Sequence, residues 1–327
     1  MKREKYIDVL KVIGLLGIML AHVQPPEVLF QLRNFDVVLM ILVSAYLGLQ
    51  SKKSEKLISY LIKRFKRLVI PTWIFISFFL LLKLLVGNFD ISLKDVFGTY
   101  ALSDFGIGYV WIIRIYFIVA ILVPLYKSLD TKLNELQILV MSLPVFICYE
   151  YLCRIGLFNN KILDYLLAYF IPCFLLLALA KLFFENSRWN ITITFISFII
   201  FVVYAAYLYR INGHFVPTQD YKYPFQLYYL SFGVFISGLL IRLTKKLTMS
   251  DYFYNKIILF MSSHSLWIYL WHILVLTMVN HFSFPWYFKF VIVVVVASVI
   301  TVIQDRLVKR LQDSGQVNTE ILNVFKG

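Results

Sequence analysis

Ten long apolar segments separated by short polar stretches are the feature that most constrains how this chain can fold. A helix that crosses the hydrocarbon core of a bilayer needs about 17 to 25 mainly apolar residues, and each segment has roughly that length. The segments cover residues 7–24, 34–50, 68–86, 108–126, 134–152, 163–183, 190–209, 225–242, 256–278 and 285–304. We therefore expect an all-α, polytopic membrane protein with about ten transmembrane helices.

The composition agrees with this expectation. Only 15% of the 327 residues are charged and 61% are hydrophobic, whereas a soluble domain has about 25% charged residues. No polar stretch is long enough for a separate soluble domain, so we expect a single transmembrane domain over residues 1–327. The first segment ends at Gln24-Pro25-Pro26 without a small-residue cleavage pattern, which predicts a retained span and not a cleaved signal peptide.

Lysine and arginine lie mostly on one side of the predicted spans. If the N-terminus is cytoplasmic, the cytoplasmic segments hold 22 of the 32 basic residues and the opposite loops hold six. The positive-inside rule predicts this bias, so we expect both termini in the cytoplasm. The net charge of +14 is then explained by the basic residues that orient the protein in the membrane. Membrane lipid is the expected partner of these charges, and nucleic acid is not expected.

A stripe of polar side chains follows one face of the first predicted helix. The step from Lys11 to His22 is 11 residues, or about 1100°, which places the two side chains within roughly 20° of each other. Asp8 lies about 40° to the other side of His22, and Lys11 and His22 are roughly 16 Å apart along the axis. Ionisable groups inside a membrane helix are costly and indicate a functional site by default. In the predicted orientation, Lys11 lies toward the cytoplasm and His22 toward the outer face.

Short motifs follow one another along the chain in a fixed order. They are Asp8-x-x-Lys11 with His22, Ser44-Ala45-Tyr46, the basic turn Arg64-x-x-Arg67 leading into a helix headed by Pro71, Tyr109-x-Trp111-x-x-Arg114, and Tyr269-Leu-Trp-His272. In this order they resemble the acyltransferase-3 family of integral-membrane O-acyltransferases. The sequence departs from that family at Lys11, where arginine is commoner, at Ala45, where the family has glycine, and at Leu39-Met40, in place of a phenylalanine pair.

The resemblance covers most of the chain and implies an O-acyltransferase of the cytoplasmic (inner) membrane. Such an enzyme would move an acyl group, expected to be acetyl, from cytosolic acetyl-CoA to a hydroxyl of a cell-surface glycan or lipid-linked sugar. That reaction is O-acetylation in polysaccharide biosynthesis. We expect no metal, because Cys148, Cys153 and Cys173 lie in apolar runs without Cys/His metal-ligand spacing.

His22 is the best candidate for the catalytic base. A neutral imidazole can take the proton from an acceptor hydroxyl that attacks a thioester carbonyl. Direct attack and an acyl-histidine intermediate are both compatible with the sequence, and the alternative role of His22 is a hydrogen-bonded packing residue. Lys11 either forms an ion pair with Asp8, its i, i+3 neighbour, or contacts the acyl donor with Asp8 orienting it.

Three arginines are candidates for contact with the donor. Arg64 and Arg67 lie one helical turn apart in a strongly basic stretch and either bind coenzyme A phosphates or serve as topology signals. Arg114 lies inside an apolar segment near Trp111, where a buried cation needs an acidic partner such as Asp36. Arg114 and Trp111 are therefore candidates for donor binding and Asp36 for acceptor binding, and the alternative for all three is a purely structural role.

The outer loop over residues 210–229 is rich in tyrosine and polar residues. His214, Tyr221 and Tyr223 could bind sugar rings, or the tyrosines could belong to the aromatic belt at the membrane interface. His272 lies at a depth similar to that of His22. It either joins the site or forms a hydrogen bond across helices.

Two other functions are compatible with this sequence. A polysaccharide or lipid-linked glycan exporter without catalysis would show paired helix interruptions in two related halves, and we find no internal repeat. A catalytically inactive relative that acts as an assembly partner is favoured by Ala45 and the absent phenylalanine pair. Thioester turnover that depends on His22 would distinguish an acyltransferase from an exporter and from an inactive relative.

Overall fold

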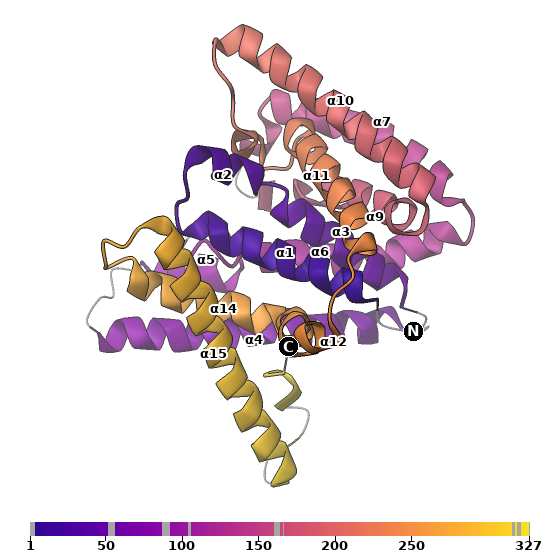
Figure 1. Cartoon of the computed structure of the whole chain (residues 1–327). Helices are drawn as coiled ribbons and strands as arrows, with labels where there is room; N and C mark the ends of the chain where they lie inside the picture. Colours follow the sequence, from indigo (N-terminus) through magenta and orange to yellow (C-terminus); the bar gives the residue numbers. More distant parts are fainter. Residues whose placement is uncertain are drawn as a thin grey trace. The chain divides into compact units, whose positions relative to one another are not determined.

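The computed structural model describes residues 4–51, 56–86, 92–103, 106–159, 164–165, 167–315, 318 and 322–326. All regular secondary structure in these ranges is helical (Figure 1), which confirms the all-α prediction. The predicted segments fall, in order, on α1 (Lys5–His22), α3 (Asp36–Leu49), α4 (Leu57–Leu85), α6 (Trp111–Asp130), α7 (Glu135–Arg154), α9 (Phe170–Glu185), α10 (Ser187–Asn212), α11 (Leu227–Lys246), α12 to α14 (Asp251–Val279) and α15 (Trp286–Asp313). Residues 163 and 166 of the sixth segment lie outside the described ranges.

The helices make this a multi-pass membrane protein. Among the described residues, seven helices are long and apolar enough to cross a bilayer, or eight if the pair Asp251–Ser263 and Ser265–Val279, bent by 75°, is one span. The helix α1 has 18 residues but carries Lys5, Asp8 and Lys11, and α9 has only 16 residues. The count of ten spans and the cytoplasmic position of both termini therefore stay predictions.

Helix α4 differs from its predicted form. The sequence predicts a turn at Arg64 and Arg67 and a helix that starts at Pro71, but α4 already begins at Leu57, and Pro71 lies inside it. Leucine, isoleucine, lysine and arginine before the apolar run all favour helix, so nothing stops the helix there. An internal proline is tolerated in a membrane helix because neighbouring groups satisfy the exposed carbonyl.

Two short helices are absent from the sequence prediction. These are α2 (Glu27–Leu32) and α5 (Leu93–Tyr100). Ser92 caps α5 by accepting a hydrogen bond from the main-chain N–H of Asp95 at 3.1 Å, which satisfies one of the open donors at a helix start. Both helices are too short to give a periodic apolar pattern.

The chain packs as two compact units. The first consists of Met1–Gly17, Pro26–Ser54 and Ile118–Thr248, and the second of Ile18–Pro25, Glu55–Phe117 and Met249–Gly327. Each unit combines three separate stretches of the chain, so the division follows packing and not chain order. The single transmembrane domain over residues 1–327 stays a prediction.

In the first unit, small residues let helices approach closely. Helix α10 packs along α11 (Figure 1), and α3 packs against α9 and α11. A Cβ atom added at Gly233 of α11 would lie 2.5 Å from Cγ2 of Val38 in α3. Close helix contact through glycine is typical of membrane proteins, where dispersion forces between packed backbones replace the hydrophobic effect.

The same unit contains a buried ion cluster of Arg33, Asp36 and Lys222. The Arg33 guanidinium donates to Oδ2 of Asp36 at 3.1 Å, and Lys222 Nζ lies 3.9 Å from Oδ1. The Asp36 carboxylate also accepts a hydrogen bond from the main-chain N–H of Val37 at 2.7 Å. All three charged residues are at most 5% exposed. Burial lowers the pKa of Lys222 to about 8, although the Asp36 carboxylate opposes the shift.

Neutral hydrogen bonds hold the loop with Lys222 in place. Thr218 accepts a hydrogen bond from the Asn34 side chain at 2.7 Å, and its own main-chain N–H donates to Gln31 at 3.0 Å. The corner between α2 and α3 is thus tied to the loop that precedes α11, and Lys222 reaches Asp36 as a result.

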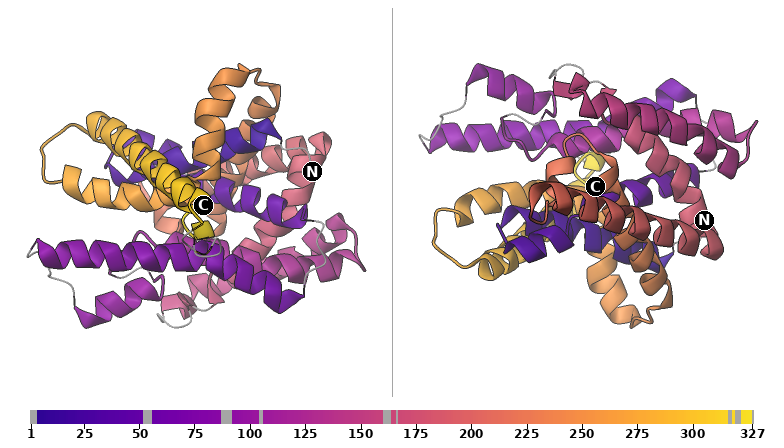
Figure 2. Two further views of the ribbon diagram at one scale, coloured as in Figure 1. Left: turned by 90° about the horizontal axis from the view of Figure 1, so that it is seen from below. Right: turned by 90° about the horizontal axis from the view of Figure 1, so that it is seen from above.

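In the second unit, α14 (Ser265–Val279) runs beside α15 (Figure 2) and also packs on α4. Trp271 of α14 joins all three helices. Its ring lies edge-on to Phe75 and Phe78 of α4, with ring centroids 5.8 Å apart in both pairs. Its indole N–H donates to the side chain of Gln304 in α15 at 2.6 Å. This packing sets the position of His272, the next residue in α14.

We predict that Asp36→Asn strongly destabilises the protein. The substitution leaves Arg33 and Lys222 buried near each other without their carboxylate, and removing one partner of a buried ion pair costs about 3–5 kcal/mol. Thermal unfolding of the protein in detergent measures the loss. Asp220→Asn, at an exposed site in the same loop, is the matched control and leaves the unfolding temperature unchanged. Equal unfolding temperatures for both variants would contradict a stabilising role of the cluster.

Candidate active site

His22 and His272 form the centre of the candidate site, in the second unit. His22 is the last residue of α1, and His272 lies in the middle of α14. Nδ1 of His22 lies 2.8 Å from Nε2 of His272, within hydrogen-bond distance. The two rings are nearly parallel, with an interplanar angle of 11°. His272 is completely buried and His22 is partly buried.

The contacts of His272 indicate which nitrogen atoms carry protons. Its Nδ1 is in hydrogen-bond contact with the main-chain carbonyl of Tyr269. A carbonyl oxygen only accepts, so Nδ1 of His272 is the donor, and Nε2 of the neutral ring carries the lone pair. That lone pair accepts a hydrogen bond from Nδ1–H of His22. In a neutral His22, Nε2 is therefore the basic nitrogen.

Tyr109 is the third member of the site. It lies in the turn before α6, and its ring meets that of His22 edge-on, with centroids 4.6 Å apart and an angle of 62°. The hydroxyl of Tyr269 donates to the main-chain carbonyl of Tyr109. Helix α14 thus positions both His272 and Tyr109 around His22. The sequence marks the two tyrosines only as motif members, and nothing in their spacing indicates this contact.

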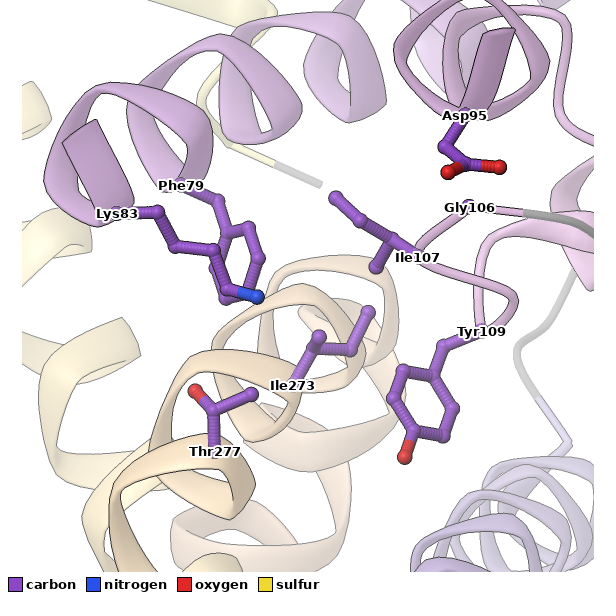
Figure 3. A pocket seen from close by; sticks show the side chains of 8 residues that line it. All are labelled: Phe79, Lys83, Asp95, Gly106, Ile107, Tyr109, Ile273 and Thr277. Atoms are coloured by element: carbon purple, nitrogen blue, oxygen red, sulfur yellow. The ribbon is translucent and has the colours of Figure 1, made fainter. Parts of the chain in front are cut away.

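A pocket of about 340 Å³ adjoins this group (Figure 3). Tyr109 lines it and also contacts His22, and Ile273 lines it directly after His272. The lining residues are Phe79, Lys83, Asp95, Gly106, Ile107, Tyr109, Ile273 and Thr277. Except for Tyr109, none of these is among the residues that the sequence motifs single out.

The residues predicted to bind the acyl donor lie in both units. Asp8 is buried and Lys11 is half-buried on α1. In α4, the Arg64 guanidinium lies 5.2 Å from the centre of the Tyr60 ring, and Arg67 is exposed. Trp111 and Arg114 are both buried at the start of α6. A shared role of these six residues in donor binding stays a prediction, as does the pairing of Arg114 with an acid.

Most residues predicted to bind the acceptor belong to the first unit. Asp36 is held by Arg33 and Lys222 in the ion cluster. Tyr221 packs edge-on against Tyr228, with ring centroids 5.3 Å apart. His214 and Tyr223 are exposed. Among the five predicted residues, His272 is the one that the structure places against His22.

The described residues hold no candidate metal site. No three histidine, cysteine, aspartate or glutamate side chains in these ranges are grouped so that they could hold a metal ion. The prediction that the reaction needs no metal stays a prediction, because this finding does not test it.

Comparison with known proteins places the chain in a family. No curated protein and no solved structure matches it. A family model described as an acyltransferase domain matches residues 4–303 and thus nearly the whole chain. The chain therefore belongs to the acyltransferase-3 family and is a multi-pass membrane acyltransferase.

Proposed function

We propose that this protein transfers an acyl group from a coenzyme A thioester to a hydroxyl of a glycan or lipid-linked sugar, with His22 as the general base. The hydrogen bond between His22 and His272 is the observation that supports this role. It fixes the orientation of the His22 ring and leaves the lone pair on Nε2, as a general base requires. Family membership supports the acyl transfer itself.

The proposed reaction needs one proton carrier. Nε2 of His22 removes the proton of the acceptor hydroxyl while the hydroxyl oxygen attacks the thioester carbonyl. The new carbon–oxygen bond forms, the carbon–sulfur bond breaks, and the proton passes from His22 to the departing thiolate of coenzyme A. His272 accepts from Nδ1–H of His22 throughout and stabilises the transient imidazolium, as an orienting group does in a catalytic triad.

The proposed binding of the acyl donor relies on positively charged side chains. Lys11, Arg64 and Arg67 would bind the phosphates and pantetheine amides of acetyl-CoA, with Asp8 orienting Lys11. Arg114 and Trp111 are further candidates for contact with the donor. Helix α1 runs without a break from Lys5 to His22, so Lys11 and His22 are roughly 16 Å apart along it. An extended pantetheine arm can bridge that distance. In the cytoplasmic membrane, the donor would enter from the cytosol and the acceptor from the outer face.

We predict that His22→Ala abolishes most of the transfer. Loss of a general base lowers turnover by about 10²–10⁴-fold. The measurement is the mass of surface glycans from cells that carry only the variant, in which the shift of one acyl unit disappears. His281→Ala, at an exposed histidine of the same unit, is the control and retains the shift. Full acylation in the His22→Ala cells would exclude His22 as the base.

His272 acts as a positioning residue in this proposal, and its chemistry can be tested by replacement. His272→Leu removes the acceptor for Nδ1–H of His22, and turnover falls by about 10–100-fold, within the range of a general-base contribution. His272→Gln restores an acceptor oxygen at that place and retains most of the activity. A purely structural role of His272 predicts instead that both variants lose activity together with thermal stability.

Donor binding is tested with the double variant Lys11→Ala, Arg67→Ala. Charge-assisted hydrogen bonds contribute about 1.5–3 kcal/mol each, so the loss of two raises the KM for acetyl-CoA by about a hundredfold or more, while kcat changes little. The control removes two exposed lysines from the same basic part of α4, in Lys63→Ala, Lys66→Ala. An equal rise of KM in both double variants would show only a general effect of charge and would contradict a specific site.

A further inference from the structure

We propose that the pocket beside the histidine pair binds an acidic sugar, with Lys83 pairing with its carboxylate or phosphate. This inference rests on the proposed function, because it assigns the acceptor site of that reaction. The position of the pocket supports it first. Tyr109 lines the pocket and its ring packs against that of His22, so one side chain connects the pocket with the proposed base.

The chemistry of the lining fits a sugar ring. Phe79, Ile107 and Ile273 offer apolar surface against which the C–H face of a sugar can pack, and Asp95 and Thr277 offer polar groups for its hydroxyls (Figure 3). A volume of about 340 Å³ lies at the lower end of the range for small-molecule sites, about 300–1,000 Å³. The pocket is therefore suited to one sugar residue and not to a long polymer.

Lys83 is the residue through which the pocket would favour a negatively charged ligand. The side chain is half-buried, and its Nζ lies 5.5 Å from the centre of the Phe79 ring. Figure 3 shows the ammonium group turned toward the interior of the pocket. Within the described ranges, no carboxylate forms an ion pair with Lys83. A partly desolvated cation without such a partner is stabilised by an anionic group of a ligand.

Helix α4 separates this pocket from the predicted donor site. Lys83 follows Arg67 by 16 residues in the same helix, which corresponds to about 24 Å along the axis. Lys83 is therefore too far from Arg64 and Arg67 to bind the same phosphate group. Two cationic groups at opposite ends of one helix match a donor and an acceptor that approach from opposite sides.

The wall of the pocket is preformed. The hydroxyl of Thr99 in α5 accepts a hydrogen bond from the main-chain N–H of Ile107 at 3.0 Å. Gly106 has a φ of +82°, and a Cβ atom there would collide with Thr99 and the main chain of Asp95. The loop can therefore pack this closely on α5 only because residue 106 is glycine. Tyr269 holds the other end of the loop at Tyr109.

The test measures binding of three probes to the purified full chain by calorimetry. They are methyl β-glucoside, which is neutral, methyl β-glucuronide, which has a carboxylate, and methyl β-glucoside 6-phosphate. We expect the wild type to bind at least one acidic probe about tenfold more tightly than the neutral one. Lys83→Met removes that preference without changing the affinity for the neutral probe, and Lys83→Arg restores it. Lys94→Met, at an exposed lysine of α5, leaves all affinities unchanged.

The outcomes separate this inference from the proposed function. An equal affinity for all three probes, binding of none, or a preference that survives Lys83→Met would overturn the acidic-sugar site. Acylation of the probes from acetyl-CoA is measured on the same samples. A Lys83-dependent preference in binding without any His22-dependent acylation would support the site and contradict the general-base reaction. The acid that binds more tightly identifies the anionic group of the acceptor.

Discussion

Polar side chains in these helices have to find hydrogen-bond partners within the protein, because the hydrocarbon core of a membrane offers none. In the first unit the carboxylate of Asp36, buried at the start of α3, has Arg33 and the loop residue Lys222 as its partners. In the second unit His22 lies against His272. Each arrangement joins parts of the chain that are far apart in sequence. The requirement that stabilises the helices thus also builds the candidate active site.

The two arrangements differ in the chemistry that they allow. The ion cluster holds opposite charges in contact, so its groups stabilise one another and a change of protonation would be costly. The histidine pair is a chain of neutral donors and acceptors that runs from the Tyr269 carbonyl through His272 to His22. Such a chain can accept a proton at Nε2 of His22, and the imidazolium that forms still donates its Nδ1–H to the lone pair of His272. The proposed reaction therefore uses the histidine pair as its base and leaves the ion cluster a structural role.

Helix α4 carries two cationic regions of the second unit at different places along its length. Arg64 and Arg67 lie toward its N-terminal end, and Lys83 lies at the pocket near its C-terminal end. Because both regions lie on one helix, about 24 Å apart along its axis, side-chain motion cannot bring them together. Acyl transfer needs both substrates at one base but not in one pocket. The separation of the two regions along α4 is compatible with the proposed reaction.

The order of amino acids alone is sufficient to predict the helical class, the place of each apolar segment and the family, because segment length and short motifs are local properties. It also marks His22 and His272 as candidates. Their contact could not be predicted, since the two residues are 250 positions apart and only the packing of α14 on its neighbours brings them together. Pro71, Asp36 and Lys83 show the same limit. Whether a proline heads a helix, which cation pairs with a carboxylate and which lysine lines a pocket depend on surroundings supplied by distant parts of the chain, and these exist only in the folded protein.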